Sequence, residues 1–513
     1  MTCHWADQNF VLHSVPLGVF LHEGSSDSES LVDDFAIKIF KDCGFGDINI
    51  SAMVSDTTGN MNKFGQLLEA LHIPHVYCTD HVLQLSAKIA FYDNSQHDER
   101  HHDMMKKVKG LVEFISRSNL VTEKLKIAQS RLDEYAGRIP LKILVDVKTR
   151  WWSTYRMLER LLYLRKAIGY LVLENDIDED DVPTEREWNI IKKVCDFLHP
   201  FKLVMKQLEG EKYSTIGLVP SLIEYLRKWI NTSVERHNVR LGGRARCRDF
   251  LEYLIKNIHI DFHERWGADD ESRFSADVVR GDRNRQYGLH PVIGIGTVLD
   301  PRYKGLRSYS NDDKENIWNH LHQIAVEYSQ SENVYTADDL DNDNRRRNRG
   351  RRHNRNNRMD NNDDEGLALF MMEMNENDDD VDIMAAYGDE DNVGELEIDD
   401  ENAHNHHYVK TNDEIQLYKR MQNLPLKTNN KFNCPLLNFW KVHENKFPVL
   451  SQLARKYLII PATSAPTERL FSTASLVISK KRSRLNPDVA GTQIFLSKIL
   501  DWYEEQVGNN NEN

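Results

Sequence analysis

The strongest constraint on the fold of this chain is a dense apolar block near its C-terminus, at residues 433–503. The block includes Asn438-Phe439-Trp440, then Tyr457-Leu458-Ile459-Ile460-Pro461, and near its end Ile494-Phe495-Leu496. A polar tract at about residues 336–407 separates it from the rest of the sequence. So much apolar surface has to be removed from water. The block must therefore pack against the distant N-terminal half, against a second copy of the chain, or against both.

Bulk properties narrow the class of protein. A length of 513 residues favours two or three domains. The net charge of −14 is unevenly distributed and says little about partners. The six cysteines are scattered without paired spacing, which favours a reducing intracellular compartment. No apolar run approaches the length of a membrane span, and no signal-peptide pattern opens the sequence, so we expect a soluble protein with no membrane partner.

Residues 1–103 alternate short strands with helices. Strands are expected at residues 10–15, 18–21, 48–54 and 75–78, with a turn at residues 6–9. Helices are expected after Ser28 or Ser30, after the turn at residues 55–62, and from Asp80. Alternation of this kind predicts an α/β layer.

The remaining sequence divides into three further parts. Residues 104–335 have apolar side chains at helical spacing, as in Met157, Leu158 and Leu161, and predict an all-α domain. Residues 336–410 are charged and of low complexity, which predicts a disordered linker. Residues 411–513 contain the apolar block.

The motifs of the apolar block resemble the C-terminal dimerisation region of hAT-family transposases. They are the Asn438-Phe439-Trp440 start, the run Ile460-Pro461-Ala462-Thr463-Ser464-Ala465 that leads to Glu468-Arg469, and the basic Lys480-Lys481-Arg482-Ser483-Arg484-Leu485. The resemblance implies an RNase H-like α/β core, here lacking its first strand, a large all-α insertion and a helical C-terminal dimerisation block. We therefore expect a homodimer or higher homo-oligomer. The expected dimerisation residues are Phe439, Trp440, Leu453, Tyr457, Leu470, Phe471, Phe495 and Leu496.

Asp56 lies where an apolar strand ends and a helix begins, which is where ligands and metals gather in open α/β sheets. The other interpretation is a carboxylate that caps the following helix. Residues 54–61 resemble the segment around the second metal-binding Asp of the hAT nuclease core. The resemblance makes Asp56 and Glu468 two members of a D,D,E catalytic triad, although a Glu in a first helical turn also interacts favourably with the helix dipole.

The first Asp of the triad is not found in this sequence. In the family it lies on a strand before the segment that residues 1–5 resemble, and Asp7 falls in a turn. Metal-dependent strand transfer needs several carboxylates to hold the divalent cations. We therefore expect Asp56 and Glu468 to be vestigial, with no transposase activity and no cofactor. A competent enzyme would need Mg²⁺ or Mn²⁺.

Cys78 and His81 match a C-x-x-H pattern that follows the second Asp in the family. Two ligands are half of a structural zinc set, and the nearby His72 and His75 are separated from them by Pro74 and a strand. We expect no metal site here, but a polar pair beside the vestigial catalytic site.

Several basic and aromatic residues are candidates for DNA binding. Residues 149–158 resemble the entry to the family's helical insertion, where Arg150 and Trp151 either contact phosphate and an unpaired base or seal a domain junction. Arg469, Lys480, Lys481, Arg482 and Arg484 are the candidates on the C-terminal block. The eight arginines of residues 345–358 indicate either a nuclear localisation signal or a solvated polyampholyte. Residues 299–304 also match a family motif, to which we assign no role beyond a turn and a helix start.

Three functional hypotheses follow. The first is a domesticated hAT-transposase derivative in the nucleus that dimerises, binds DNA weakly and lacks transposase activity. The second is an active D,D,E transposase whose first Asp is supplied upstream or elsewhere. The third is a fragment without a stable independent fold.

Overall fold

A computed structural model describes the chain in two compact units. The first unit combines Met1–Asp80, Gln207–Ile223 and Asp269–Asn513, and the second combines His81–Lys206 and Glu224–Ala268. Each unit is therefore assembled from several stretches of the sequence, and the boundaries at residues 103, 335 and 410 stay a prediction. The described residues are 2–17, 30, 50–92, 99–146, 151–241, 247–267, 289–335, 406–424, 427–428, 431–432, 436–470, 489, 491–493, 495–496 and 499–500.

The first unit begins with a β-hairpin. Strand β1 (Thr2–Ala6) pairs antiparallel with β2 (Leu12–Pro16). The expected turn between them is confirmed, and the Asp7 carboxylate stabilises it by accepting hydrogen bonds from the Asn9 and Val11 backbone N–H groups at 2.8 and 2.9 Å. Phe10 has a φ of 61° and belongs to this turn, so the second strand begins two residues later than expected.

The β-α-β-α order that follows was predicted from the sequence. Strand β3 (Met53–Ser55) pairs parallel with β4 (His75–Tyr77), and helix α2 (Gly59–Ala70) connects them. Phe64 and Leu68 of α2 are buried together with Ile73. An α/β arrangement is therefore present here, but the described residues of the chain are mostly helical. An RNase H-like sheet stays a prediction.

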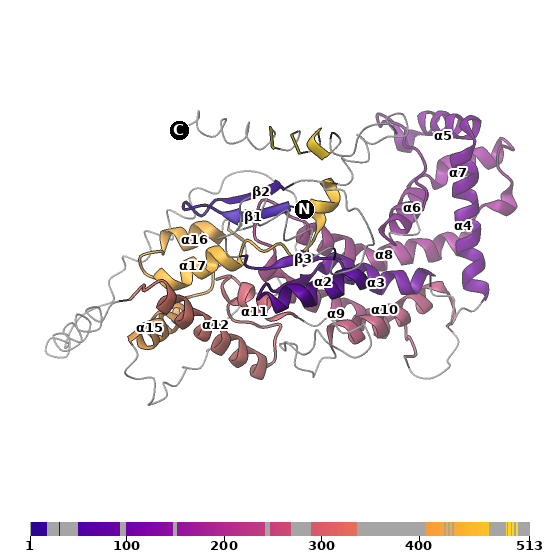
Figure 1. The fold of residues 1–513 in the computed structure, drawn as a ribbon. Helices are drawn as coiled ribbons and strands as arrows, with labels where there is room; N and C mark the ends of the chain where they lie inside the picture. The colour runs from indigo at the N-terminus through magenta and orange to yellow at the C-terminus, as the bar shows by residue number, and fades with distance from the viewer. Residues whose placement is uncertain are drawn as a thin grey trace. The chain divides into compact units, whose positions relative to one another are not determined.

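Helices form the rest of the first unit. The C-terminal block folds with the segment that precedes the polar tract, since α17 contacts α11, α12, α15 and α16, and α15 also contacts α12. Figure 1 shows α12, α15, α16 and α17 together. The bounds are η4 (Ile216–Leu218), α11 (Pro291–Val298), α12 (Asn311–Ser331), α15 (His406–Arg420), α16 (Leu436–Val442) and α17 (Pro448–Tyr457), with a short β5–β6 ladder at Lys427–Thr428 and Lys431–Phe432.

The second unit is helical throughout its described part, which confirms the prediction of a large helical region. Helix α5 packs against α4 and α7, and α6 packs against α7. The helices that lie mainly in this unit are α3 (Thr79–Tyr92), α4 (Glu99–Arg117), α5 (Asn119–Arg131), α6 (Trp151–Tyr163), α7 (Arg165–Leu173), α8 (Glu185–Leu208), α9 (Val219–Arg236) and α10 (Phe250–Trp266), with short 3₁₀ turns η2 (Asp133–Tyr135) and η3 (Glu179–Asp181).

Two further findings bear on the sequence analysis. Among the described helices, none has both the length and the apolar character that crossing a bilayer requires. The strand expected at residues 18–21, most of the helix expected after Ser28, the polar tract up to residue 405 and the basic segment at residues 480–484 lie outside the described residues.

Candidate functional site around Asp80 and Glu468

The site lies where residues 461–470 of the C-terminal block meet the junction of β4 and α3, within the first unit. The Thr79 backbone N–H donates to the Ala462 carbonyl at 3.0 Å. The Ser464 N–H donates to the Cys78 sulfur at 3.2 Å. Two parts of the chain that are almost four hundred residues apart are thus joined by direct hydrogen bonds. Both parts belong to the first unit, so the described C-terminal block packs against the N-terminal part of the sequence.

Glu468 lies in the first turn of a helical segment at residues 465–470, as the sequence predicts. The segment starts at Ser464, whose carbonyl accepts a hydrogen bond from the Glu468 N–H at 3.1 Å. On the same segment, the Thr467 hydroxyl bonds the Thr2 hydroxyl of β1 at 3.0 Å. The N-terminal hairpin and the C-terminal block therefore both position Glu468.

Asp80 is the most deeply buried acidic group at this site, and the sequence analysis did not single it out. It occupies the first turn of α3, is 3% exposed, and its Oδ1 has no hydrogen-bond partner among the described residues. Burial raises the pKa of its carboxyl well above the usual value, and the neighbouring Glu209 and Glu468 raise it further. Both effects favour the protonated form of the Asp80 carboxyl, which also has a side-chain hydrogen bond with Glu209.

Arg469 faces carboxylates of its own chain. Its guanidinium forms ion pairs with Glu209 at 3.6 Å and with Glu211, and it donates a hydrogen bond to the Glu209 carbonyl at 2.8 Å. Both ion pairs are partly exposed to water, so their contribution to stability is small. Arg469 was predicted from the sequence as a candidate for DNA binding, and its partners in the structure are carboxylates. DNA binding by Arg469 stays a prediction.

Asp56 takes part in a local turn at the end of β3. Its Oδ1 accepts hydrogen bonds from the Thr58 N–H at 3.0 Å and the Thr58 hydroxyl at 2.8 Å, which stabilises the entry to α2. Its titratable neighbour is His75. Burial lowers the pKa of His75 to about 4, and the charge of Asp56 opposes this shift in part. Within the described ranges, no group of three or more His, Cys, Asp or Glu side chains is arranged to hold a metal ion. The assignment of Asp56 and Glu468 to vestigial positions of the triad stays a prediction.

The His and Cys residues of the extended C-x-x-H pattern have separate structural contacts. His75 is buried and its Nε2 lies 2.7 Å from the Ser55 hydroxyl. Cys78 is fully buried and receives the Ser464 N–H. These two side chains hold β3 and the C-terminal block against β4.

Residues 299–304, to which the sequence analysis gave no role, attach the C-terminal block to the rest of the first unit. The buried Asp300 carboxylate accepts two hydrogen bonds from the buried Arg302 guanidinium, at 3.0 and 2.8 Å. The Lys304 ammonium is also buried and donates to the Tyr418 carbonyl at 2.6 Å, near the C-terminus of α15. The sequence signal that could have indicated this role is the position of three charged residues directly after the apolar run 292–299. Charged residues next to a buried run are themselves easily buried, and buried charges need partners.

Most of the expected dimerisation residues are core residues of the single chain. Trp440 is fully buried and its Nε1 donates to the Leu299 carbonyl at 3.0 Å. Side chains at most 9% exposed offer little surface to a partner, so their contact with a second subunit stays a prediction. Leu496, by contrast, is 47% exposed and Phe495 is half-buried. The buried residues of the expected set are Phe439, Trp440, Leu453, Tyr457 and Leu470.

Several expected site residues lie outside the described part of the chain. They include the Trp151 side chain at the start of α6, although its backbone is described as helical. The others are Arg150, Phe471, Lys480, Lys481, Arg482 and Arg484.

Two family models match this chain. Residues 414–500 match the hAT family C-terminal dimerisation region, and residues 76–197 match the ZBED1 RNase-like helical domain. The first match contains Glu468 and α17, and the second begins at β4 and includes α6. The chain is thus similar to a helical RNase-like domain in one part and to a dimerisation region in another.

Curated relatives agree with these matches. The chain is 22% identical to a putative AC transposase of Zea mays over 98% of its own length and 54% of the relative. It is 20% identical to zinc finger BED domain-containing protein 4 of Homo sapiens, over 87% of this chain and 31% of the relative. It is 22% identical to a putative transcriptional regulator of Talaromyces stipitatus, over 85% of this chain and 44% of the relative. These matches confirm the resemblance to hAT-family transposases that the sequence motifs indicate. The chain spans about half or less of the length of these relatives.

Proposed function

We propose that this chain is a hAT-transposase-derived nuclear protein that self-associates through its C-terminal block, binds DNA weakly and does not catalyse transposition. The observation that carries the proposal is the match of residues 414–500 to a dimerisation region, in a segment that is folded onto the rest of the first unit. An assembled block of this kind provides a stable platform for a second subunit.

The surface that contacts the second subunit is the exposed apolar face at residues 489–500. Val489, Leu496 and Leu500 are 46%, 47% and 55% exposed. Separations of seven and four residues would place these side chains on one side of a helix. Each of the three residues is itself described as helical. Covering an apolar stripe with an identical one removes both from water.

Light scattering after size exclusion tests this assignment. Leu496→Asp should shift the chain from dimer to monomer, because the new carboxylate would have to be desolvated at the contact. The matched control is Leu120→Asp on α5, a leucine of the second unit that is 67% exposed. A dimer that survives Leu496→Asp, or a wild-type chain that is monomeric at micromolar concentration, would refute this surface.

DNA binding and nuclear location follow from the named relatives and from the basic residues. Two of the three relatives described above are named as a transposase and a transcriptional regulator. Lys480, Lys481, Arg482 and Arg484 supply cations for phosphate contacts of the kind that weaken steeply with salt. Replacing these four residues by Gln should abolish binding of a DNA duplex at low salt, as measured by fluorescence anisotropy. Unchanged binding would count against the assignment.

The absence of transposition is supported by the roles of the two acidic positions. Asp56 stabilises the turn before α2, while the neighbours of Glu468 include Asp80, whose raised pKa favours a neutral carboxyl. The test is DNA cleavage by the chain in Mg²⁺ or Mn²⁺, for which no product is expected. Cleavage that both Asp56→Ala and Glu468→Gln abolish would instead establish the alternative, an active D,D,E transposase.

A further inference from the structure

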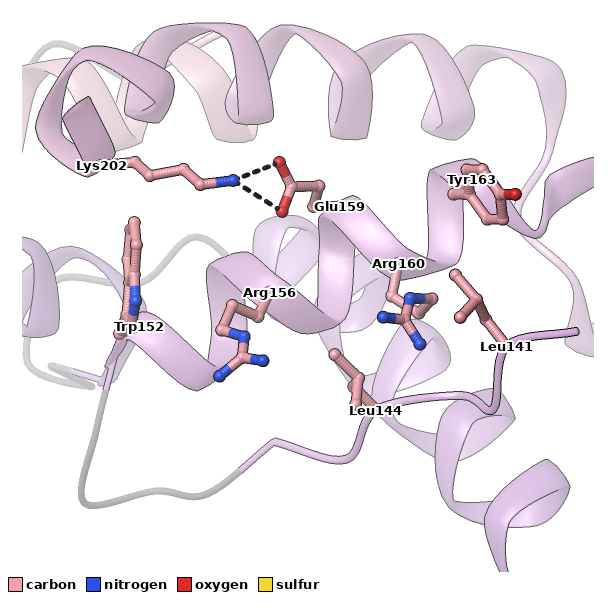
Figure 2. Close-up of a pocket in the computed structure, with 8 residues that line it drawn as sticks. All are labelled: Leu141, Leu144, Trp152, Arg156, Glu159, Arg160, Tyr163 and Lys202. Carbon is pink, nitrogen blue, oxygen red and sulfur yellow. Dashed lines mark hydrogen bonds and ion pairs between the residues drawn. The ribbon is translucent and has the colours of Figure 1, made fainter. Parts of the chain in front are cut away.

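A pocket of about 430 Å³ opens in the second unit between α6, α8 and the segment before α6. Figure 2 shows its lining. Arg156 and Arg160 extend from α6 on the side of Leu144 and Leu141, while Glu159 extends toward Lys202 of α8. The lining residues are Leu141, Leu144, Trp152, Arg156, Glu159, Arg160, Tyr163 and Lys202.

The cations of the pocket follow a regular spacing on α6. Trp152, Arg156 and Arg160 are each four residues apart, so they form one row along the helix. Two like charges at this spacing repel each other and destabilise a helix slightly, and an anion bound between them would offset that repulsion. The spacing therefore favours a bound anion.

The charge of the pocket is not balanced by its own side chains. Glu159 is paired with Lys202, at 3.1 and 3.3 Å, so these two groups neutralise each other. Arg160 donates to the Lys142 carbonyl at 2.6 Å, which leaves its charge in place. Arg156 is exposed and has no ion pair in the part of the chain that the structure describes. Two guanidinium groups therefore give the pocket a net positive charge, in the planar geometry that suits a phosphate.

The rest of the lining is flat and apolar. The Trp152 indole stacks on the Tyr155 ring, with centroids 5.0 Å apart and planes at 9°, which holds the indole in one orientation. Leu141 and Leu144 are half-buried on the opposite segment. A ligand that fits both parts carries a phosphate and a planar, partly apolar body.

We propose that this pocket binds a nucleotide. Arg156 and Arg160 contact its phosphate, and the base lies against Trp152 and the two leucines. The nucleotide is either free or the unpaired 5′ end of a DNA strand, since both present the same groups. The proposal is independent of the DNA contacts proposed for the basic residues of the C-terminal block, which belong to the other unit.

Calorimetric titration of the full chain tests the proposal with two probes, dTMP and a short 5′-phosphorylated oligo(dT). Arg156→Gln should weaken binding about tenfold or more, as expected for the loss of one charge-assisted hydrogen bond. The matched control is Arg186→Gln, an exposed arginine of α8 outside the pocket, which should leave the Kd unchanged. Trp152→Leu should weaken binding of dTMP but not of inorganic phosphate, and Trp152→Phe should restore it.

The outcomes distinguish a free nucleotide from the 5′ end of a DNA strand, and both from a pocket that binds neither. Binding of dTMP without the oligonucleotide identifies a free nucleotide, and the reverse identifies a strand end. No binding of either probe, or equal weakening by Arg156→Gln and Arg186→Gln, overturns the proposal. Binding of an unphosphorylated duplex should not change in Arg156→Gln, so failure here is distinct from failure of the proposed DNA contact.

Discussion

Glu414 of α15 caps a different helix, and this contact allows a quantitative prediction. The carboxylate is 5% exposed and accepts hydrogen bonds from the Val449 N–H at 3.1 Å and the Leu450 N–H at 2.7 Å, in the first turn of α17. The Tyr335 hydroxyl donates to it as well. The first N–H groups of a helix have no partner within that helix, so α17 depends on Glu414 for this turn.

Replacing Glu414 by Ala should therefore leave two buried N–H groups without an acceptor. At about 1–3 kcal/mol for each group, α17 loses roughly 2–6 kcal/mol of local stability. Hydrogen exchange of the peptide that covers α17 should accelerate by about 30-fold or more. Glu414→Gln keeps an acceptor oxygen and should have a smaller effect. Asp413→Ala, at the exposed neighbouring position, is the control. Unchanged exchange in Glu414→Ala would refute the capping role.

The same residue makes local stability depend on pH. Burial raises the pKa of Glu414 from 4.5 to about 7, in opposition to hydrogen bonds that favour the ionised form. Between these values the folded state binds more protons than the unfolded state, so stability falls as pH rises. The shift corresponds to about 3 kcal/mol, present in full below pH 4.5 and lost by about pH 7. Glu414→Gln should remove this dependence between pH 5 and pH 8, and a persistent slope in that range would show that another group causes it.

Three further variants test other contacts of the first unit. A Cβ at Gly65 would lie 1.9 Å from the buried His75 ring, so Gly65→Ala should cost roughly 2 kcal/mol or more in thermal unfolding, whereas Gly59→Ala, with open space around it, should not. Lys304→Met should remove the buried donor to the carbonyls at the end of α15 and cost roughly 1–3 kcal/mol, seen as faster exchange in α15. The pKa of Asp80 is raised in the folded state, so the unfolded state releases this proton at a lower pH and Asp80 lowers stability as pH rises. Asp80→Asn should therefore stabilise the chain at pH 8 but not at pH 4. Equal effects at the two pH values would contradict the raised pKa.

Local sequence signals were sufficient to predict the elements around the candidate site. The strand before Asp56, the strand at residues 75–77 and the helix start before Glu468 were all expected from apolar runs, turn residues and Pro or Ser at helix starts. Each of these signals acts over a few residues. The structure agrees because the tertiary contacts reinforce the local preferences.

The roles of Asp80 and residues 299–304 could not be predicted in the same way. Asp80 is an ordinary first-turn carboxylate in the sequence, and its raised pKa follows from burial near Glu209 and Glu468, which are distant in the chain. Lys304 binds carbonyls more than a hundred residues away. A local sequence pattern cannot predict such contacts, because the partner residues are distant in the sequence and meet only when the segments pack.

The many apolar residues of the C-terminal block are consistent with packing in the core of one chain and with contact to a second subunit. The burial of each side chain separates these two roles. Trp440 and its apolar neighbours are buried in the core of one chain, while Leu496 is exposed. A substitution such as Trp440→Asp would therefore unfold the block. Any loss of the dimer in that variant would report unfolding and not the loss of a contact between subunits. Since Ala462 and Ser464 also hold the β4–α3 junction, deleting the block would disturb the surroundings of Asp80 as well. Only variants of exposed residues such as Leu496 can test self-association separately from folding.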